Sequence, residues 1–169
     1  PAGSTIDSMK LLLTSLAKEF GQDTAAQRLN KKLDADLAAA QAYVKGFPKS
    51  PRVMIIHFGQ QRNQYFVLGT RGAANKMIQL AGGINVADTS GFRNLSPEMV
   101  AQAQPDVILA TDFGYDRLGS AAKFMELPGI GLTPAAKNGK IFRIEEHDLI
   151  YFGPRTGENI INMAKLIQQ

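Results

Sequence analysis

The sequence contains no cysteine, only two histidines and no long uncharged hydrophobic run. Without cysteine, the chain cannot form a disulfide scaffold, a thiol nucleophile or a cysteine-ligated metal site. A membrane-spanning helix needs about 18 or more consecutive apolar residues, and no stretch of the sequence approaches that length. The lack of cysteine fits an oxidising compartment, but many cytosolic proteins share it, so it decides little about location.

Motifs of hydrolytic enzymes and of nucleic-acid binding are also missing. The sequence has no Gly-x-Ser-x-Gly and no His-Glu-x-x-His motif. The acidic stretch 145–148 includes His147, but neighbouring residues on a strand point to opposite faces, so this stretch predicts a solvated strand end. The net charge is +4, yet no run of five or more Lys or Arg residues occurs. The sequence therefore predicts neither an enzyme nor a nucleic-acid partner.

The first 50 of the 169 residues have a helical pattern. Apolar residues recur at spacings of three and four from Ile6 to Phe20 and again from Ala26 to Val44. A glycine and an aspartate interrupt the pattern near 21–23. We predict one long, nearly continuous helical rod over residues 1–50 with a break at that point. Such a rod is expected to connect the rest of this chain to a further part of a larger protein.

After Pro51 the pattern changes to alternating strands and helices. Apolar runs predict strands at 52–59, 64–69, 106–111 and 140–145. Capping and punctuation signals predict helices at 73–80, 96–104, 120–126 and 154–167. Buried strands that alternate with helices are typical of an α/β sheet with helices on both faces, here over residues 51–169.

The segment from Tyr65 to Asp88 has the outline of a nucleotide-binding unit, because an apolar strand runs into glycines and a helix follows. A dinucleotide-binding fingerprint requires Gly-x-Gly-x-x-Gly. Here Gly69 and Gly72 are three residues apart, Arg71 lies between them, and no Gly-Lys-Ser/Thr follows. We therefore predict an ordinary strand-to-helix turn. A nucleotide-dependent α/β enzyme remains an alternative from a different functional class.

Side chains suited to ligand binding lie at predicted strand ends and helix starts. His57 is near the carboxyl end of the first predicted strand, where open α/β sheets bind ligands, and neutral imidazole is a good iron ligand. Tyr115 and Arg117 follow the strand at 106–111, where the guanidinium could favour the phenolate or pair with a ligand carboxylate. Arg155 is in the first turn of the last helix, where a bound anion would offset its conflict with the helix dipole. Each is also compatible with an ordinary surface or core position, which the sequence alone favours for His57 and Tyr115.

Four segments resemble, in the same order, the haem-binding periplasmic proteins of bacterial ATP-binding-cassette (ABC) importers. They are GTRGAANKMIQLAGGINV, LSPEMVAQAQPDVIL, LPGIGLTPAAKNGKIF and DLIYFGPRTGENI. The LAGGxN and PDVI elements resemble the broader family that also carries siderophores and cobalamin, whereas LPGxxxTPA and FGPRT resemble its haem branch. The resemblance implies a Rossmann-like C-terminal lobe preceded by a long interlobe linking helix, with the N-terminal lobe absent from this chain.

The resemblance also implies a function. The protein is expected to carry haem in the periplasm and to deliver it to the permease of an inner-membrane ABC importer, without catalysis and with any outer-membrane receptor involved only indirectly. His57 becomes the leading candidate for an iron ligand, with Tyr115 as a weaker one. Arg117, Tyr115 and Arg155 are expected to contact the haem or its propionates. Glu98, at an exposed helix start, is the candidate for docking on the permease, although a first-turn acid also suits the helix dipole.

Other interpretations stay open at this point. A siderophore or cobalamin carrier of the same family would not need His57 or a phenolate. A nucleotide-dependent enzyme would need a phosphate loop that the glycine spacing does not supply. A single lobe could lack binding competence of its own, because half a cleft buries half a ligand. The face that the other lobe would cover is expected to favour self-association.

Overall fold

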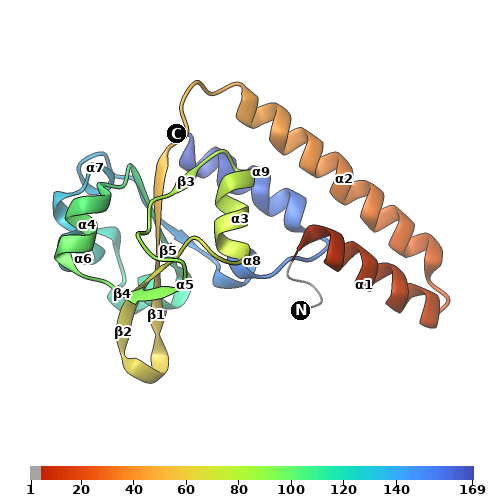
Figure 1. The fold of residues 1–169 in the computed structure, drawn as a ribbon, viewed down its shortest axis with the longest axis horizontal. Coiled ribbons are helices and arrows are strands. Elements are labelled where there is room, and N and C mark those ends of the chain that lie inside the picture. The colour runs from red at the N-terminus through yellow and green to blue at the C-terminus, as the bar shows by residue number, and fades with distance from the viewer. Residues whose placement is uncertain (1–4) are drawn as a thin grey trace.

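The computed structural model describes residues 5–169 as a mixed sheet flanked by helices, with a helical hairpin at one side (Figure 1). The helices are α1 (Ile6–Glu19), α2 (Asp23–Lys45), α3 (Ala73–Leu80), α4 (Pro97–Ala103), α5 (Asp112–Leu118), α6 (Ala121–Phe124), α7 (Pro134–Lys137), α8 (Glu146–Ile150) and α9 (Thr156–Ile167). The strands are β1 (Arg52–Gly59), β2 (Gln64–Leu68), β3 (Ile84–Asn85), β4 (Phe92–Asn94), β5 (Val107–Thr111) and β6 (Ile141–Ile144), and the 3-10 turns are η1 (Gln60–Arg62) and η2 (Ile130–Leu132). Over this range, no helix combines the length and the apolar character needed to span a membrane.

The first two helices form an antiparallel hairpin, which corrects the expectation of one nearly continuous rod. The chain reverses near 21–23, where Gly21 has a φ of +62° that a side chain would strain. The two helices then pack along each other, and Lys10 Nζ of α1 lies 2.6 Å from Asp34 Oδ1 of α2. The helical periodicity of the two segments is therefore real, but the turn between them reverses the chain.

The second helix also packs along α9, so it forms part of the core of the α/β lobe. The close approach is possible because residue 157 is glycine: a Cβ at Gly157 would lie 2.3 Å from the Cβ of Asp36. Further along α2, Ala40 is fully buried in the same hydrophobic core as α9. At the edge of the contact, Lys32 Nζ lies 2.5 Å from Glu158 Oε1. The lobe thus anchors α2, and α2 in turn carries α1.

The sheet has the strand order β4-β2-β1-β5-β6, with β3 paired to β1. Strands β1, β5 and β6 are parallel, whereas β2 runs antiparallel to both β1 and β4. The direction of β2 follows from its connection, because only η1 and Asn63, with a φ of +50°, separate it from β1. A parallel partner would need a long crossover, which the sequence provides only between the later strands. The predicted α/β fold is confirmed, with an antiparallel edge.

Alternate residues of β1 point into two hydrophobic cores on opposite faces of the sheet. Val53 and Ile55 pack with α2, α3, α8 and α9, which we call the α8 side. Their neighbours Met54 and Ile56 pack with α4, α6 and α7, which we call the α4 side. The two groups of helices lie on opposite sides of the strands in Figure 1. The alternation continues to the carboxyl end of β1, so it decides which side each residue there can serve.

Candidate functional site

His57 lies on the α8 side, near the carboxyl end of β1, and contacts a carboxylate. Its Nδ1 is 2.9 Å from Glu146 Oε2 and 3.4 Å from Thr111 Oγ1. Thr111 is the last residue of β5, and Glu146 follows β6 as the first residue of α8. The ends of three neighbouring parallel strands therefore converge on one imidazole, at the edge where open α/β sheets bind ligands.

Sequence reasoning missed Glu146. The stretch 145–148 was predicted to be a solvated strand end whose side chains diverge, whereas the structure has helix α8 there. The helical turn directs Glu146 to His57, while Asp148 lines a different cavity. The sequence did contain a signal for this helix, because acidic residues gathered over one turn are typical of a helix start.

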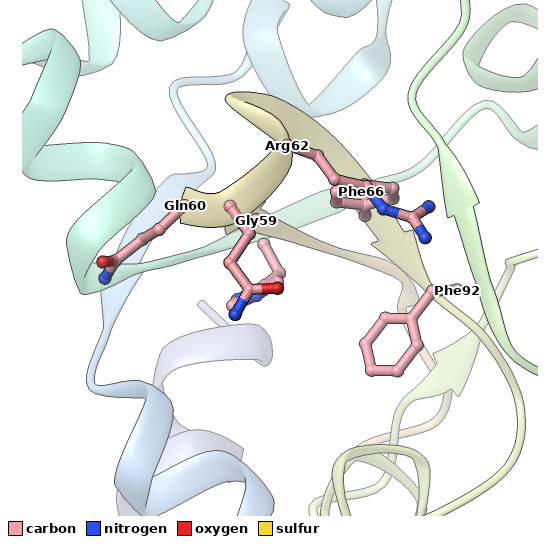
Figure 2. A pocket seen from close by; sticks show the side chains of 7 residues that line it. Gly59, Gln60, Arg62, Phe66 and Phe92 are labelled. Carbon is pink, nitrogen blue, oxygen red and sulfur yellow. The ribbon is translucent and has the colours of Figure 1, made fainter.

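An open cavity of about 520 Å³ adjoins His57, and we call it the His57 cavity. Its lining consists of His57, Gly59, Gln60, Gln61, Arg62, Phe66 and Phe92. Figure 2 shows the Phe92 ring and the Arg62 guanidinium on the same side of the β1–β2 turn, with Gln60 directed the other way. The Phe92 side chain is 73% exposed, and its ring centroid is 6.4 Å from that of His57. The cavity thus combines aromatic surface, an imidazole and a cation.

Arg62 is the cation of this cavity, and it was not among the sequence candidates. Within the part of the chain that the structure describes, no carboxylate lies within salt-bridge distance of its guanidinium. The sequence did contain a signal for Arg62, because it lies in the polar turn directly after β1, at the edge where open α/β sheets bind ligands. An unpaired arginine at the rim of a cavity suits a carboxylate of a bound molecule.

Tyr115 and Arg117 lie across the sheet from His57, on the α4 side. A helix, α5, follows β5, and this helix turns Tyr115 back towards the core. The Tyr115 ring stacks on Phe124 with the centroids 6.1 Å apart. The guanidinium carbon of Arg117 lies 4.8 Å from the centroid of the Phe58 ring. The structure therefore does not bring Tyr115 and His57 together, and the role of Tyr115 as an iron ligand remains a prediction that its packing does not favour.

Arg155 does not line the His57 cavity. It is the residue before α9, and it lines a separate cavity of about 230 Å³. Its Nη2 is 3.6 Å from Asp148 Oδ1, so the protein itself supplies an anion that offsets the cation at this helix start. Contact between Arg155 and a haem propionate remains a prediction.

Comparison with known proteins identifies the family. Residues 1–147 match the family model described as periplasmic binding protein.

The chain belongs to the periplasmic binding protein family.

Solved structures with the same fold include three periplasmic haem-binding proteins. RhuT from Roseiflexus sp. RS-1, in its apo form, is similar with a TM-score of 0.90 and 29% identity, over 99% of this chain and 64% of that one. BhuT in complex with two haems is similar with a TM-score of 0.87 and 27% identity, over 98% of this chain and 63% of that one. The haem-binding protein HutB of Vibrio cholerae, at 24% identity, a TM-score of 0.85 and coverage of 99% and 66%, supports the fold. This binding protein thus spans less than two thirds of the length of RhuT and BhuT. No curated protein matches its sequence.

Glu98 of this binding protein is explained locally by the start of α4. Ser96 caps the helix by accepting a hydrogen bond from the backbone N–H of Met99. A hydrogen bond from the backbone N–H of Glu98 itself, and a second with the Ser96 side chain, hold the pKa of the Glu98 carboxyl below its usual range. These contacts keep Glu98 ionised and exposed at the helix start. Its role in docking on a permease remains a prediction.

The glycine turn after β2 does not form a phosphate cradle. The backbone N–H groups of Gly69, Thr70 and Arg71 donate to carbonyl oxygens of residues 89–91. A Cβ on Gly69 would lie 2.3 Å from one of those carbonyl oxygens, so glycine here permits the close approach of two backbone segments. These three N–H groups are therefore not available to a phosphate. This geometry does not favour a nucleotide-binding turn at residues 69–71.

Proposed function

We propose that this chain is the linking and C-terminal part of a periplasmic carrier that delivers haem to an ABC importer. The His57 cavity carries the proposal, because it places an imidazole beside exposed aromatic surface and an unpaired arginine. Haem is an apolar disc with two carboxylates and one iron, and each of these parts has a matching side chain in the cavity. No bond is made or broken in this function, which is binding and release rather than catalysis. The similarity to RhuT and BhuT, both described as periplasmic haem-binding proteins, supports this proposal.

The chemistry of each side chain in the cavity indicates which part of haem it would contact. The His57 imidazole coordinates the iron, and the exposed Phe92 ring covers part of the porphyrin face. Arg62, which has no carboxylate partner among the described residues, pairs with a propionate. The cavity is open, so it covers one side of a ligand, and we propose that an N-terminal lobe covers the other side.

The same site favours haem over the other cargoes of the family. A siderophore surrounds its iron with its own donor atoms, and neither a siderophore nor a cobalamin requires an imidazole from the protein. An imidazole that contacts a carboxylate on one nitrogen and lines a cavity is typical of a metal ligand. The site therefore favours a metal with an open axial position, as in haem.

Location and partners follow from the family. We propose that the protein works in the periplasm and docks on the permease through the surface around Glu98, which is ionised at the exposed start of α4. An outer-membrane receptor would act only upstream, by supplying haem.

A second partner surface lies on α1. Leu12, Leu16 and Phe20 are 44%, 49% and 75% exposed, and their spacing of four residues places them along one side of this helix. We propose that this exposed apolar stripe pairs with a second copy of the chain when an N-terminal lobe does not cover it.

A haemin titration followed in the Soret region tests the cargo. We expect the wild-type chain to shift the Soret band, and we expect His57→Ala to alter the spectrum and weaken binding. His147→Ala is the matched control, because His147 is the other histidine and does not line the His57 cavity. Metal-free protoporphyrin separates coordination from apolar contact, since it should bind His57→Ala and wild type alike. Absence of a Soret change both in this chain and in a two-lobe parent protein would overturn the proposal, and a His57→Ala spectrum identical to wild type would show that His57 is not an axial ligand.

A further inference from the structure

The contact between Glu146 and His57 has a consequence for how the imidazole meets a metal. We propose that Glu146 is a positioning residue: it holds His57 in the Nδ1–H tautomer and in one ring orientation, so that the Nε2 lone pair is available to the iron of a bound haem. The effect on haem binding rests on the proposed function, whereas the effect on the tautomer concerns the ligand-free chain alone.

The tautomer follows from the chemistry of the two partners. An ionised carboxylate can only accept hydrogen bonds, and Glu146 Oε2 lies 2.9 Å from Nδ1. Nδ1 must then carry the proton and donate it. The Thr111 hydroxyl, 3.4 Å from the same nitrogen, adds a second polar group on this side of the ring. No hydrogen bond from residues 5–169 engages Nε2, and the ring lines the His57 cavity.

The carboxylate is held by elements that do not depend on a ligand. The backbone N–H of Glu146 donates to Asp112 Oδ1 at a distance of 3.2 Å. Leu149 of the same helix is fully buried in the core of the α8 side. Asp112 follows Thr111 directly, so the end of β5 both contacts the imidazole and holds the backbone of Glu146. The side chains of His57 and Glu146 are 22% and 32% exposed, which shields the pair from water.

This arrangement strengthens the imidazole as a ligand in two ways. A fixed ring does not lose rotational freedom when it coordinates a metal, and a carboxylate on Nδ1 increases the electron density that Nε2 can donate. Loss of such a partner typically weakens metal binding by about 10–100-fold. Glu145, the adjacent carboxylate, points elsewhere: its Oε1 is 2.5 Å from Arg143 Nη1. It therefore supplies a matched control.

The first test reads the tautomer directly in the ligand-free chain. With only two histidines, a two-bond ¹H–¹⁵N correlation spectrum in mildly alkaline buffer shows which ring nitrogen carries the proton in each. We expect the Nδ1–H form for His57 in wild type and in Glu146→Gln, whose amide oxygen can still accept. We expect a shift towards the Nε2–H form in Glu146→Ala, with His147 unchanged. A wild-type His57 in the Nε2–H form, or an unchanged tautomer in Glu146→Ala, would refute the inference.

The second test measures haemin affinity and the reduction potential of the bound iron. We expect Glu146→Ala to bind roughly 10–100-fold more weakly and to raise the potential, because a less electron-rich imidazole stabilises ferric iron less. The isosteric Glu146→Gln should raise the potential with a smaller loss of affinity, and Glu145→Gln should change neither quantity.

The two hypotheses fail separately. If neither this chain nor a two-lobe parent protein binds haemin, the proposed function fails and the tautomer result still decides the inference. If wild type binds through His57 and Glu146→Ala retains the affinity and the potential, the inference fails and the proposed function stands.

Discussion

Substituting Gly157 with alanine tests whether α2 is an integral part of the lobe. A Cβ at this position would lie 2.3 Å from the Cβ of Asp36 and 3.3 Å from its Cγ. Ordinary contacts of a Cβ begin at 3.4 Å, so the nearest pair must separate by about 1.1 Å (3.4 minus 2.3). The Asp36 Cβ is bonded to the backbone of α2 and cannot rotate away. The whole helix must therefore shift relative to α9.

Two opposing effects set the expected magnitude. Overpacking of a closely packed contact typically costs about 1–3 kcal/mol, and a displacement of a whole helix belongs to the upper half of that range. Alanine is favoured over glycine inside a helix by about 1 kcal/mol, and by less in the first turn, where Gly157 lies. The difference predicts that Gly157→Ala lowers the free energy of unfolding by about 1–2 kcal/mol.

Urea unfolding followed by circular dichroism measures this difference. Gly153→Ala is the control, because a Cβ at Gly153 would meet no atom within 4 Å and its φ is not in the left-handed region. We expect a lower urea midpoint for Gly157→Ala and no loss for Gly153→Ala. A Gly157→Ala chain as stable as wild type, or more stable, would show that α2 can shift relative to α9 without loss of stability, and would refute the reasoning.

Three further predictions concern charge, ligation and association. A hydrogen bond from Arg143 holds the pKa of Asp116 below its ordinary value of 3.8, so the stabilisation is complete above that pH and is lost as the pH falls through the lowered pKa. Asp116→Asn should therefore lower the urea midpoint at pH 7, and the difference from wild type should narrow at pH 3. Tyr115→Phe should leave the haemin Soret spectrum unchanged, because the Tyr115 ring packs against the core of the α4 side; an altered spectrum would restore Tyr115 as a ligand. Replacing Leu16 and Phe20 with serine should reduce any dimer seen in analytical ultracentrifugation, and an unchanged dimer would place the contact elsewhere.

Local structure was largely predictable from the sequence. The first strand, predicted over 52–59, and the helix predicted over 73–80 match β1 and α3. The signals for both lie within the elements or directly beside them, as an apolar run for β1 and as glycines before and after α3. No helix was predicted at 112–118, and 145–148 was predicted to be a strand end; in both places a short helix follows a strand, and local patterns do not distinguish a helical turn from a loop.

The candidate site was predictable only in part. His57 was found because its place at a strand end can be read from the sequence. Its partners Thr111 and Glu146 were not found. They lie at or just after the ends of β5 and β6, strands that are distant from β1 in the chain and close to it only in the sheet. Tyr115 was proposed as a ligand because Arg117 is close to it in the sequence. That proximity does not reveal on which face of the sheet the Tyr115 side chain lies.

The sequence by itself determined that this chain is an α/β protein of the periplasmic binding protein family, because periodicity, caps and family motifs are local properties. It also determined that the segments forming α1 and α2 are helical, but not that the second folds back along the first. Tertiary structure alone decided that α2 joins the lobe through Gly157, and that one side of α1 stays exposed. It also decided that His57 and Glu146 meet beside an open cavity. These outcomes depend on strand order and helix packing, which bring together residues that no local pattern relates.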